Sequence, residues 1–163
     1  MSGEGWVFRN FRKRRRKLPH WEDDGAVYFV TPVTDAAFSG SLTTPELASA
    51  IVEVLHHDDG RRYDLHAYVI MPDHMHLLFQ PLPRDGSCVS LSEIMHAIKG
   101  VSAHRINRLL QREGAVWEVE SHDRAVRDER EYHSKWWYIR RNPVRAGLVQ
   151  TPEDWPWLWP QPE

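Results

Sequence analysis

Two apolar segments separated by only two residues place the strongest constraint on how this chain can fold. Leu65–Met71 and His74–Gln80 have the β-branched and aromatic character of strands, and Pro72-Asp73 between them marks a tight turn or kink. A further strand is predicted over Ala26–Val33, where Pro32 indicates an edge position, a bulge or an early end. The centre of the chain therefore predicts two strands that follow one another directly.

Helices are predicted both before and after this strand pair in the sequence. Thr44, followed by a proline, is the expected N-cap of the first helix, and a capping box at Ser90 opens a long second helix. A capping box at Asp128 opens the last helix. Because Pro143 disfavours helical geometry in the residue before it, this last helix is expected to end near Asn142.

With a last strand expected over Trp117–Val126, the elements follow the order β-α-β-β-α-β-α. The first six are those of an α+β, ferredoxin-like β-α-β-β-α-β sandwich, in which an antiparallel sheet has its helices on one face. The seventh is an additional C-terminal helix. We expect an arm over residues 1–20, one domain over 21–150 and a tail over 151–163, which Trp155 and Trp157 hold against the core.

The charge of the chain is unevenly distributed. The formal net charge of −2 excludes a uniformly basic nucleic-acid coat, yet residues 1–20 hold seven Lys and Arg against one acid. This arm is either a solvated tail or a source of phosphate contacts. Its basic residues are Arg9, Arg12, Lys13, Arg14, Arg15, Arg16 and Lys17.

Cysteine content and hydropathy indicate the compartment. Cys88 is the single cysteine, so an intramolecular disulfide is excluded, and a reducing cytoplasm is expected. No apolar run approaches the roughly 20 residues that cross a membrane. We therefore expect a cytoplasmic protein that does not bind membranes.

His74-Met75-His76 is the most distinctive local motif. Residues i and i+2 of a strand point to the same face, so the two imidazoles can converge on one divalent cation while Met75 points into the core. The alternative interpretation is a pair of ordinary histidines on a half-exposed strand. The motif alone leaves both interpretations open.

A second group of polar residues lies on the predicted last helix. Tyr138 and Asn142 are four residues apart and share one face, together with Glu131 and Lys135. Alternatively, the tyrosine packs at the margin of the core and the asparagine caps the helix end. If these residues instead form a site together with the two histidines, the combined set fits one reaction. A metal held by two imidazoles and an amide oxygen would polarise a phosphate that the phenol attacks, giving a 5′-phosphotyrosine and a free 3′-OH.

The sequence resembles a known family over most of its length. AYVIMPDHMHLLFQP resembles the HUH signature (His, hydrophobic, His) of single-tyrosine transposases. YIRRNPVRAGLV, followed by EDWPW, resembles the C-terminal signature of the REP-associated tyrosine transposases, which are relatives of the smallest insertion-sequence transposases. LPHWEDDGAVYFVT and WEVESHDRAVRDEREY resemble the corresponding family segments, and the resemblance runs in order from about Leu18 to Trp157.

The resemblance implies a role for each motif. His74 and His76 would be the metal-ligand pair, Tyr138 the nucleophile and Asn142 the third ligand, with Mg²⁺ or Mn²⁺ as the metal. The substrate would be single-stranded DNA with a hairpin and a short flanking recognition sequence. The enzyme is expected to act as a monomer with its own tyrosine, and a dimer that exchanges tyrosine helices is the alternative.

DNA contacts are expected from the basic arm and from a cluster of arginines around the tyrosine helix. The cluster consists of Arg124, Arg127, Arg140, Arg141 and Arg145. Two other functions compete with a transposase: a domesticated protein that binds hairpin DNA without cleaving it, and a phosphoesterase or zinc hydrolase that uses water as its nucleophile. The hydrolase predicts that Tyr138→Phe retains turnover.

Overall fold

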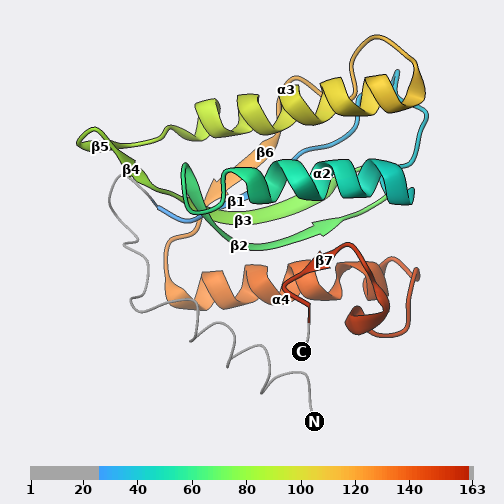
Figure 1. Cartoon of the computed structure of the whole chain (residues 1–163). Coiled ribbons are helices and arrows are strands. Elements are labelled where there is room, and N and C mark those ends of the chain that lie inside the picture. The colour runs from blue at the N-terminus through green and yellow to red at the C-terminus, as the bar shows by residue number, and fades with distance from the viewer. Residues whose placement is uncertain (1–25, 162–163) are drawn as a thin grey trace.

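The computed structural model describes residues 26–161 (Figure 1). The predicted DNA contacts of the basic arm lie outside the described residues. Those contacts are Arg9, Arg12, Lys13, Arg14, Arg15, Arg16 and Lys17.

The described chain forms one antiparallel five-stranded sheet with the order β6-β1-β3-β2-β7. The first four positions of this order are those of a ferredoxin-like sandwich, as predicted, and β7 extends the sheet beyond β2. The strands are β1 (Tyr28–Thr31), β2 (Tyr63–Ile70), β3 (Met75–Pro81), β6 (His122–Ala125) and β7 (Leu158–Trp159).

The turn between β2 and β3 forms where the sequence predicts it. The amide of Met71 donates to the carbonyl of His74 over 2.8 Å, which closes the Pro72-Asp73 turn. β1 ends one residue before Pro32, in agreement with the predicted early end. The segment after β3 contains a small hairpin of β4 (Pro83–Arg84) and β5 (Ser87–Cys88).

The last predicted strand is much shorter than the sequence indicates. Only His122–Ala125 pairs with β1, although the prediction begins at Trp117. Trp117 is buried, and its Nε1 donates to Ser102 Oγ over 2.9 Å. The apolar tryptophan therefore belongs to the core and makes a single isolated bridge to Thr34.

Three α-helices in the described chain cover the two faces of the sheet. α2 (Pro45–His57) and α3 (Leu91–Leu110) lie on one face and α4 (Glu129–Arg145) lies on the other (Figure 1). Ser90 and Asp128 are the N-caps of α3 and α4, as predicted, since their side chains accept hydrogen bonds from the third residue of each helix.

α4 continues past Pro143, so the prediction that it ends near Asn142 is wrong. Proline removes one donor from the helix and strains the preceding turn. Here Pro143 is buried in the packed helix, and the carbonyls of Asn142 and Pro143 accept hydrogen bonds from the amides of Ala146 and Leu148. Tertiary packing and these hydrogen bonds offset the local cost, and Gly147, at a φ of +75°, follows the end of the helix.

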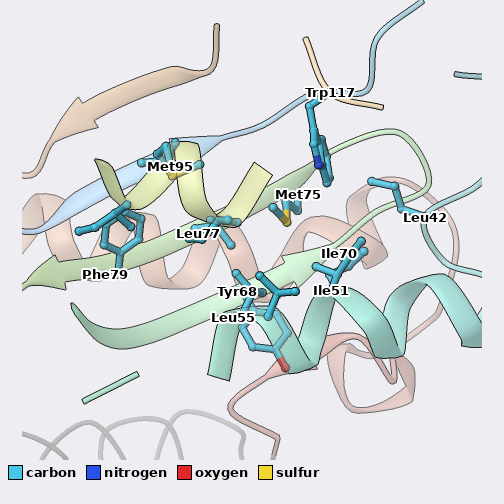
Figure 2. Packing of buried hydrophobic residues seen from close by; sticks show 14 of the residues in the cluster. Leu42, Ile51, Leu55, Tyr68, Ile70, Met75, Leu77, Phe79, Met95 and Trp117 are labelled. Carbon is cyan, nitrogen blue, oxygen red and sulfur yellow. The ribbon is translucent and has the colours of Figure 1, made fainter. Parts of the chain in front are cut away.

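The sheet separates two apolar clusters. Met75, Leu77 and Phe79 of β3 point toward α2 and α3 (Figure 2). Leu78, between them, belongs to the cluster under α4. Because helices cover both faces, β2 and β3 are buried along almost their whole length.

The C-terminal segment returns to the sheet and is held there by aromatic side chains. Trp155 Nε1 donates to the carbonyl of Ile70 over 3.0 Å, and Trp159 of β7 stacks on Tyr68 with ring centroids 5.8 Å apart. The aromatic residues of the tail therefore lie against β2, in agreement with the prediction. Within residues 26–161 no helix combines the length and the apolar character that crossing a membrane requires.

Candidate functional site

His74 and His76 lie together at the start of β3. His74 immediately precedes the strand and forms an isolated bridge with Val33, and His76 pairs with Val69 of β2. The ring centroids of the two histidines are 4.9 Å apart. Met75 between them is fully buried in the cluster under α2 and α3. The strand thus presents both imidazoles on one face, as predicted.

One nitrogen of each histidine is held by a neighbouring side chain. His74 Nδ1 lies 2.7 Å from the Asp73 carboxylate, and His76 Nδ1 lies 2.7 Å from Thr31 Oγ1. A carboxylate can only accept, so His74 Nδ1 is the donor of this contact, and Nε2 is the His74 nitrogen left to face a ligand. His76 Nε2 is buried and has no hydrogen-bond partner among residues 26–161. Metal-binding imidazoles have this arrangement: one nitrogen held by the protein and the other open.

Burial keeps the His76 ring neutral. Desolvation, together with the charges of His74 and Lys135, lowers the pKa of His76 from 6.5 to about 3. A neutral imidazole is the form that binds a metal, since protonation would occupy the lone pair. His76 is therefore in the ligand form throughout the physiological pH range.

Tyr138 of α4 lies directly beside the histidine pair of its own chain. Its ring meets His76 edge-on with centroids 5.2 Å apart, and it meets Phe29 in the same way at 5.9 Å. Phe29 in turn stacks on His76 at 5.3 Å. The tyrosine is 37% exposed, so its phenol is open to solvent while one side of its ring packs on the site.

Asn142 lies one turn after Tyr138 on α4 and is half-buried. Across the described residues, no group of three or more His, Cys, Asp or Glu side chains could hold a metal ion. A third protein ligand beside the histidines would therefore have to be of another type. An asparagine on the tyrosine face of α4 is compatible with that requirement.

The polar stripe of α4 crosses the sheet obliquely. Glu131 pairs with Arg124 on β6, Lys135 Nζ lies 4.8 Å above the ring of Phe29 on β1, and Tyr138 meets the histidine on β3. Partial burial opposes ionisation of Glu131, but hydrogen bonds from the Arg127 amide and the Arg124 side chain hold its pKa below the usual value. Successive turns of the helix thus contact successive strands.

The model of the family described as "Transposase IS200 like" matches residues 26–123. The chain belongs to this family. The matched residues include the histidine pair and end before α4, which the structure places beside them.

Individual relatives extend the similarity to most of the chain. The REP-associated tyrosine transposase of Escherichia coli is 29% identical over 134 residues, which covers 81% of this chain and 74% of that protein. A Haemophilus influenzae protein provisionally given the same name is 28% identical over 141 residues, covering 82% and 78% respectively. A solved structure of a REP-associated tyrosine transposase bound to a REP hairpin matches with a TM-score of 0.66 and 25% identity, covering 88% of this chain and 82% of that one.

The arginines predicted to contact DNA differ in how available their side chains are in this chain. Arg141 and Arg145 are exposed and lie over the rings of Trp137 and Tyr138 at 5.1 and 5.3 Å. Arg124 and Arg127 are also exposed, although both pair with Glu131. Arg145 is the one of these that lies against the tyrosine ring itself.

Arg140 does not have the predicted role. It is 3% exposed, and its guanidinium donates to the Glu153 carboxylate over 2.9 Å and to the carbonyl of Pro160 over 3.2 Å. The prediction that it contacts DNA is corrected here: the side chain points under α4 and holds the C-terminal segment. An i to i+1 step on a helix rotates the side chain by about 100°, which places Arg140 inside and Arg141 outside.

Several residues of the site were not singled out from the sequence as parts of it. Thr31, Asp73 and Phe29 orient or pack the histidines. Asp73 could have been found because it precedes His74 directly. Thr31 and Phe29 depend on the register of β1 against β3, which a strand pattern does not specify.

Proposed function

We propose that this chain is a transposase that cleaves and rejoins single-stranded DNA at hairpin elements through a 5′-phosphotyrosine on Tyr138. One observation carries the proposal: in a chain of the IS200-like family, the tyrosine ring packs on His76 of the same chain. The relative solved with a REP hairpin supports a hairpin-bearing strand as substrate.

Tyr138 supplies the nucleophile. Its phenolic oxygen would form a bond to the phosphorus as the bond from phosphorus to the 3′ oxygen breaks, which leaves a 5′-phosphotyrosine and a free 3′-OH. The phenolic proton leaves to solvent, to which the side chain is open, and the departing 3′ oxygen takes up a proton. Attack of a 3′-OH on the phosphotyrosine reverses these steps and rejoins the strand without an energy source.

His74 and His76 would hold a divalent cation, Mg²⁺ or Mn²⁺, through their Nε2 atoms, and Asn142 through its side-chain oxygen. The buried, unpartnered Nε2 of His76 and the Nδ1 contacts of both rings fit such a group. When bound, the cation would polarise the phosphate and stabilise the charge that develops on the leaving oxygen.

The surroundings of the site suit a single strand rather than a buried small molecule. An open hollow of about 440 Å³ beside His74 is lined by polar residues such as Ser39 and Asp73 and by the apolar Met71, Pro72 and Leu148. Arg145 lies over the tyrosine ring and would contact backbone phosphates. Since each chain carries a histidine pair beside its own tyrosine, we propose that a monomer is competent.

The covalent intermediate provides the test. A hairpin-bearing strand labelled at its 3′ end is incubated with the protein and Mn²⁺, and the products are separated on a denaturing gel. We expect a labelled protein–DNA adduct that EDTA abolishes. A strand labelled at its 5′ end should instead release a labelled fragment with a free 3′-OH.

Two tyrosine variants make the test specific. Tyr138→Phe should form no adduct, whereas Tyr28→Phe, on β1 and packed against the opposite cluster, should react like the wild type. Hairpin binding without cleavage under any metal would support the domesticated DNA-binding protein instead. Cleavage that persists in Tyr138→Phe would support a hydrolase that uses water.

A further inference from the structure

A pocket of about 380 Å³ lies between β6 and the N-terminal half of α4, the helix that carries the tyrosine. Its lining is almost entirely polar: four basic side chains, two acidic ones and Ser134. Lys135 belongs both to this lining and to the polar stripe that leads to Tyr138. The pocket is therefore adjacent to the proposed reaction centre but distinct from the histidine pair.

The charges of the pocket do not cancel. Glu131 is engaged by Arg124 and Arg127, and Asp128 caps the helix by accepting from the Glu131 amide. No carboxylate of the described residues forms an ion pair with Arg130 or Lys135. Two of the four positive charges consequently remain available to an anion.

Lys135 is linked to the tyrosine through one aromatic ring. Its Nζ lies 4.8 Å from the centre of Phe29, and Phe29 contacts both His76 and Tyr138. A lysine three residues before the tyrosine also lies on the same side of the helix. Lys135 and Tyr138 thus contact the same aromatic ring, so an anion bound by this ammonium would lie on the tyrosine side of α4.

We propose that the pocket binds a backbone phosphate of the DNA single strand adjacent to the linkage at Tyr138, with Lys135 as its principal ligand and Arg130 and Ser134 as supporting donors. This inference rests on the proposed function, which supplies the strand. The lining contains no aromatic side chain on which a base could stack, so the charged backbone is the part of the strand that fits. The Asp128 side chain already caps the N-terminus of α4 by accepting from the Glu131 amide. We therefore expect side chains, rather than helix amides, to bind the phosphate.

Salt dependence of binding tests the contact without any chemistry. Each phosphate contact on a single strand contributes about −0.7 to the slope of log K against log salt concentration. In a Tyr138→Phe background, with a fluorescent hairpin-bearing strand as probe, Lys135→Gln should make the slope shallower by about 0.7 and weaken binding about 5-fold at low salt. Lys135→Arg should retain the slope, and the exposed Arg108→Ala, on α3 across the sheet, should match the background.

Neutralising single phosphates identifies the contact. In strands that carry one methylphosphonate each, one position next to the cleaved linkage should weaken binding to the background protein and have no further effect with Lys135→Gln. If every position weakens both proteins equally, or if Lys135→Gln keeps the full slope, the pocket does not bind a phosphate. If one methylphosphonate weakens binding only when Lys135 is present, while the wild type forms no covalent adduct, the phosphate site is supported and the proposed function fails.

Discussion

The two faces of the sheet differ in what fills them. Beneath α2 and α3 the strands contribute aliphatic and aromatic residues to one large apolar cluster. Beneath α4 a smaller apolar cluster gives way to His76, Lys135 and Tyr138 at its margin. One strand supplies both faces, since Met75 and His76 are neighbours and point in opposite directions.

This difference shows where the molecule departs from good local packing. The α2/α3 face follows the ordinary rules: its buried side chains are mostly apolar, and the buried hydroxyl of Ser102 accepts a hydrogen bond from the indole nitrogen of Trp117. The α4 face contains a buried imidazole nitrogen without a partner and a proline inside a helix. Such departures concentrate at functional sites, where one face of a domain stabilises the fold while the other holds reactive groups.

Substitutions of His76 and Met75, neighbours on β3 that face opposite sides of the sheet, should show the difference between the two faces most clearly. His76→Ala should reduce the rate of adduct formation by at least about 100-fold, because loss of a ligand exceeds the 10- to 100-fold effects of its outer partners. Met75→Ala should instead lower the free energy of unfolding by about 2 to 5 kcal/mol, since the side chain is fully buried.

The measurement combines urea unfolding with the rate of adduct formation at a temperature where both variants are folded. Equal loss of activity in both variants, at full folding, would show that the two faces are not functionally separate. A His76→Ala protein that forms the adduct at the wild-type rate would show that His76 has no role in the reaction.

Two adjacent arginines of α4 extend the comparison to the C-terminal segment. Arg140→Ala should destabilise the protein by about 3 kcal/mol, because it removes a buried side chain, its charged hydrogen bond to the partly exposed Glu153 and a hydrogen bond to the tail. Arg141→Ala, an exposed neighbour, should change stability by less than about 0.5 kcal/mol. Thermal unfolding of both variants checks this, and a larger effect at Arg141 would contradict the assignment of Arg140 to the interior.

Thr31 should affect metal binding rather than folding. Thr31→Val removes the hydroxyl that holds His76 Nδ1 and keeps the shape of the side chain. We expect Mn²⁺ affinity to fall by about 10-fold, as for other outer partners of a ligand. Calorimetric titration with Mn²⁺ measures the change, and Thr151→Val, at an exposed hydroxyl of the C-terminal segment, is the matched control.

The smallest predicted effect is a pH dependence of stability without metal. The pKa of His76 is about 3 in the folded protein and about 6.5 when exposed, so below pH 6.5 the unfolded chain binds a proton that the folded chain does not. The stabilisation is complete above pH 6.5 and is lost as the pH falls toward 3. In EDTA, the stability of the wild type relative to His76→Ala should fall by about 1.4 kcal/mol between pH 7.5 and 5.5. A pH-independent difference would contradict the neutral, buried ring.

Most of the fold could be predicted from the sequence because its signals are local. Turn residues, capping boxes at Ser90 and Asp128, and apolar periodicity give the order of elements, and that order specifies the sandwich. The errors arose where tertiary contacts override local preference. Pro143 does not end α4 because packing compensates for it, and Trp117 is drawn into the core instead of extending β6.

The site was predictable in part for the same reason. The spacing of His74 and His76 and of Tyr138 and Asn142 places each pair on one face, and the family resemblance joins the pairs. The contacts of Thr31, Phe29 and Lys135 require strand register and helix placement, which arise only in the folded sheet. The burial of Arg140 likewise depends on the returning C-terminal segment.

The most direct test of the account is to locate the atom to which DNA becomes attached. The adduct formed with a hairpin-bearing strand and Mn²⁺ is digested with protease and nuclease, and the modified peptide is sequenced by tandem mass spectrometry. The account predicts a nucleotide joined through its 5′ phosphate to Tyr138. Attachment to any other residue, or cleaved strands without a modified peptide, would contradict it.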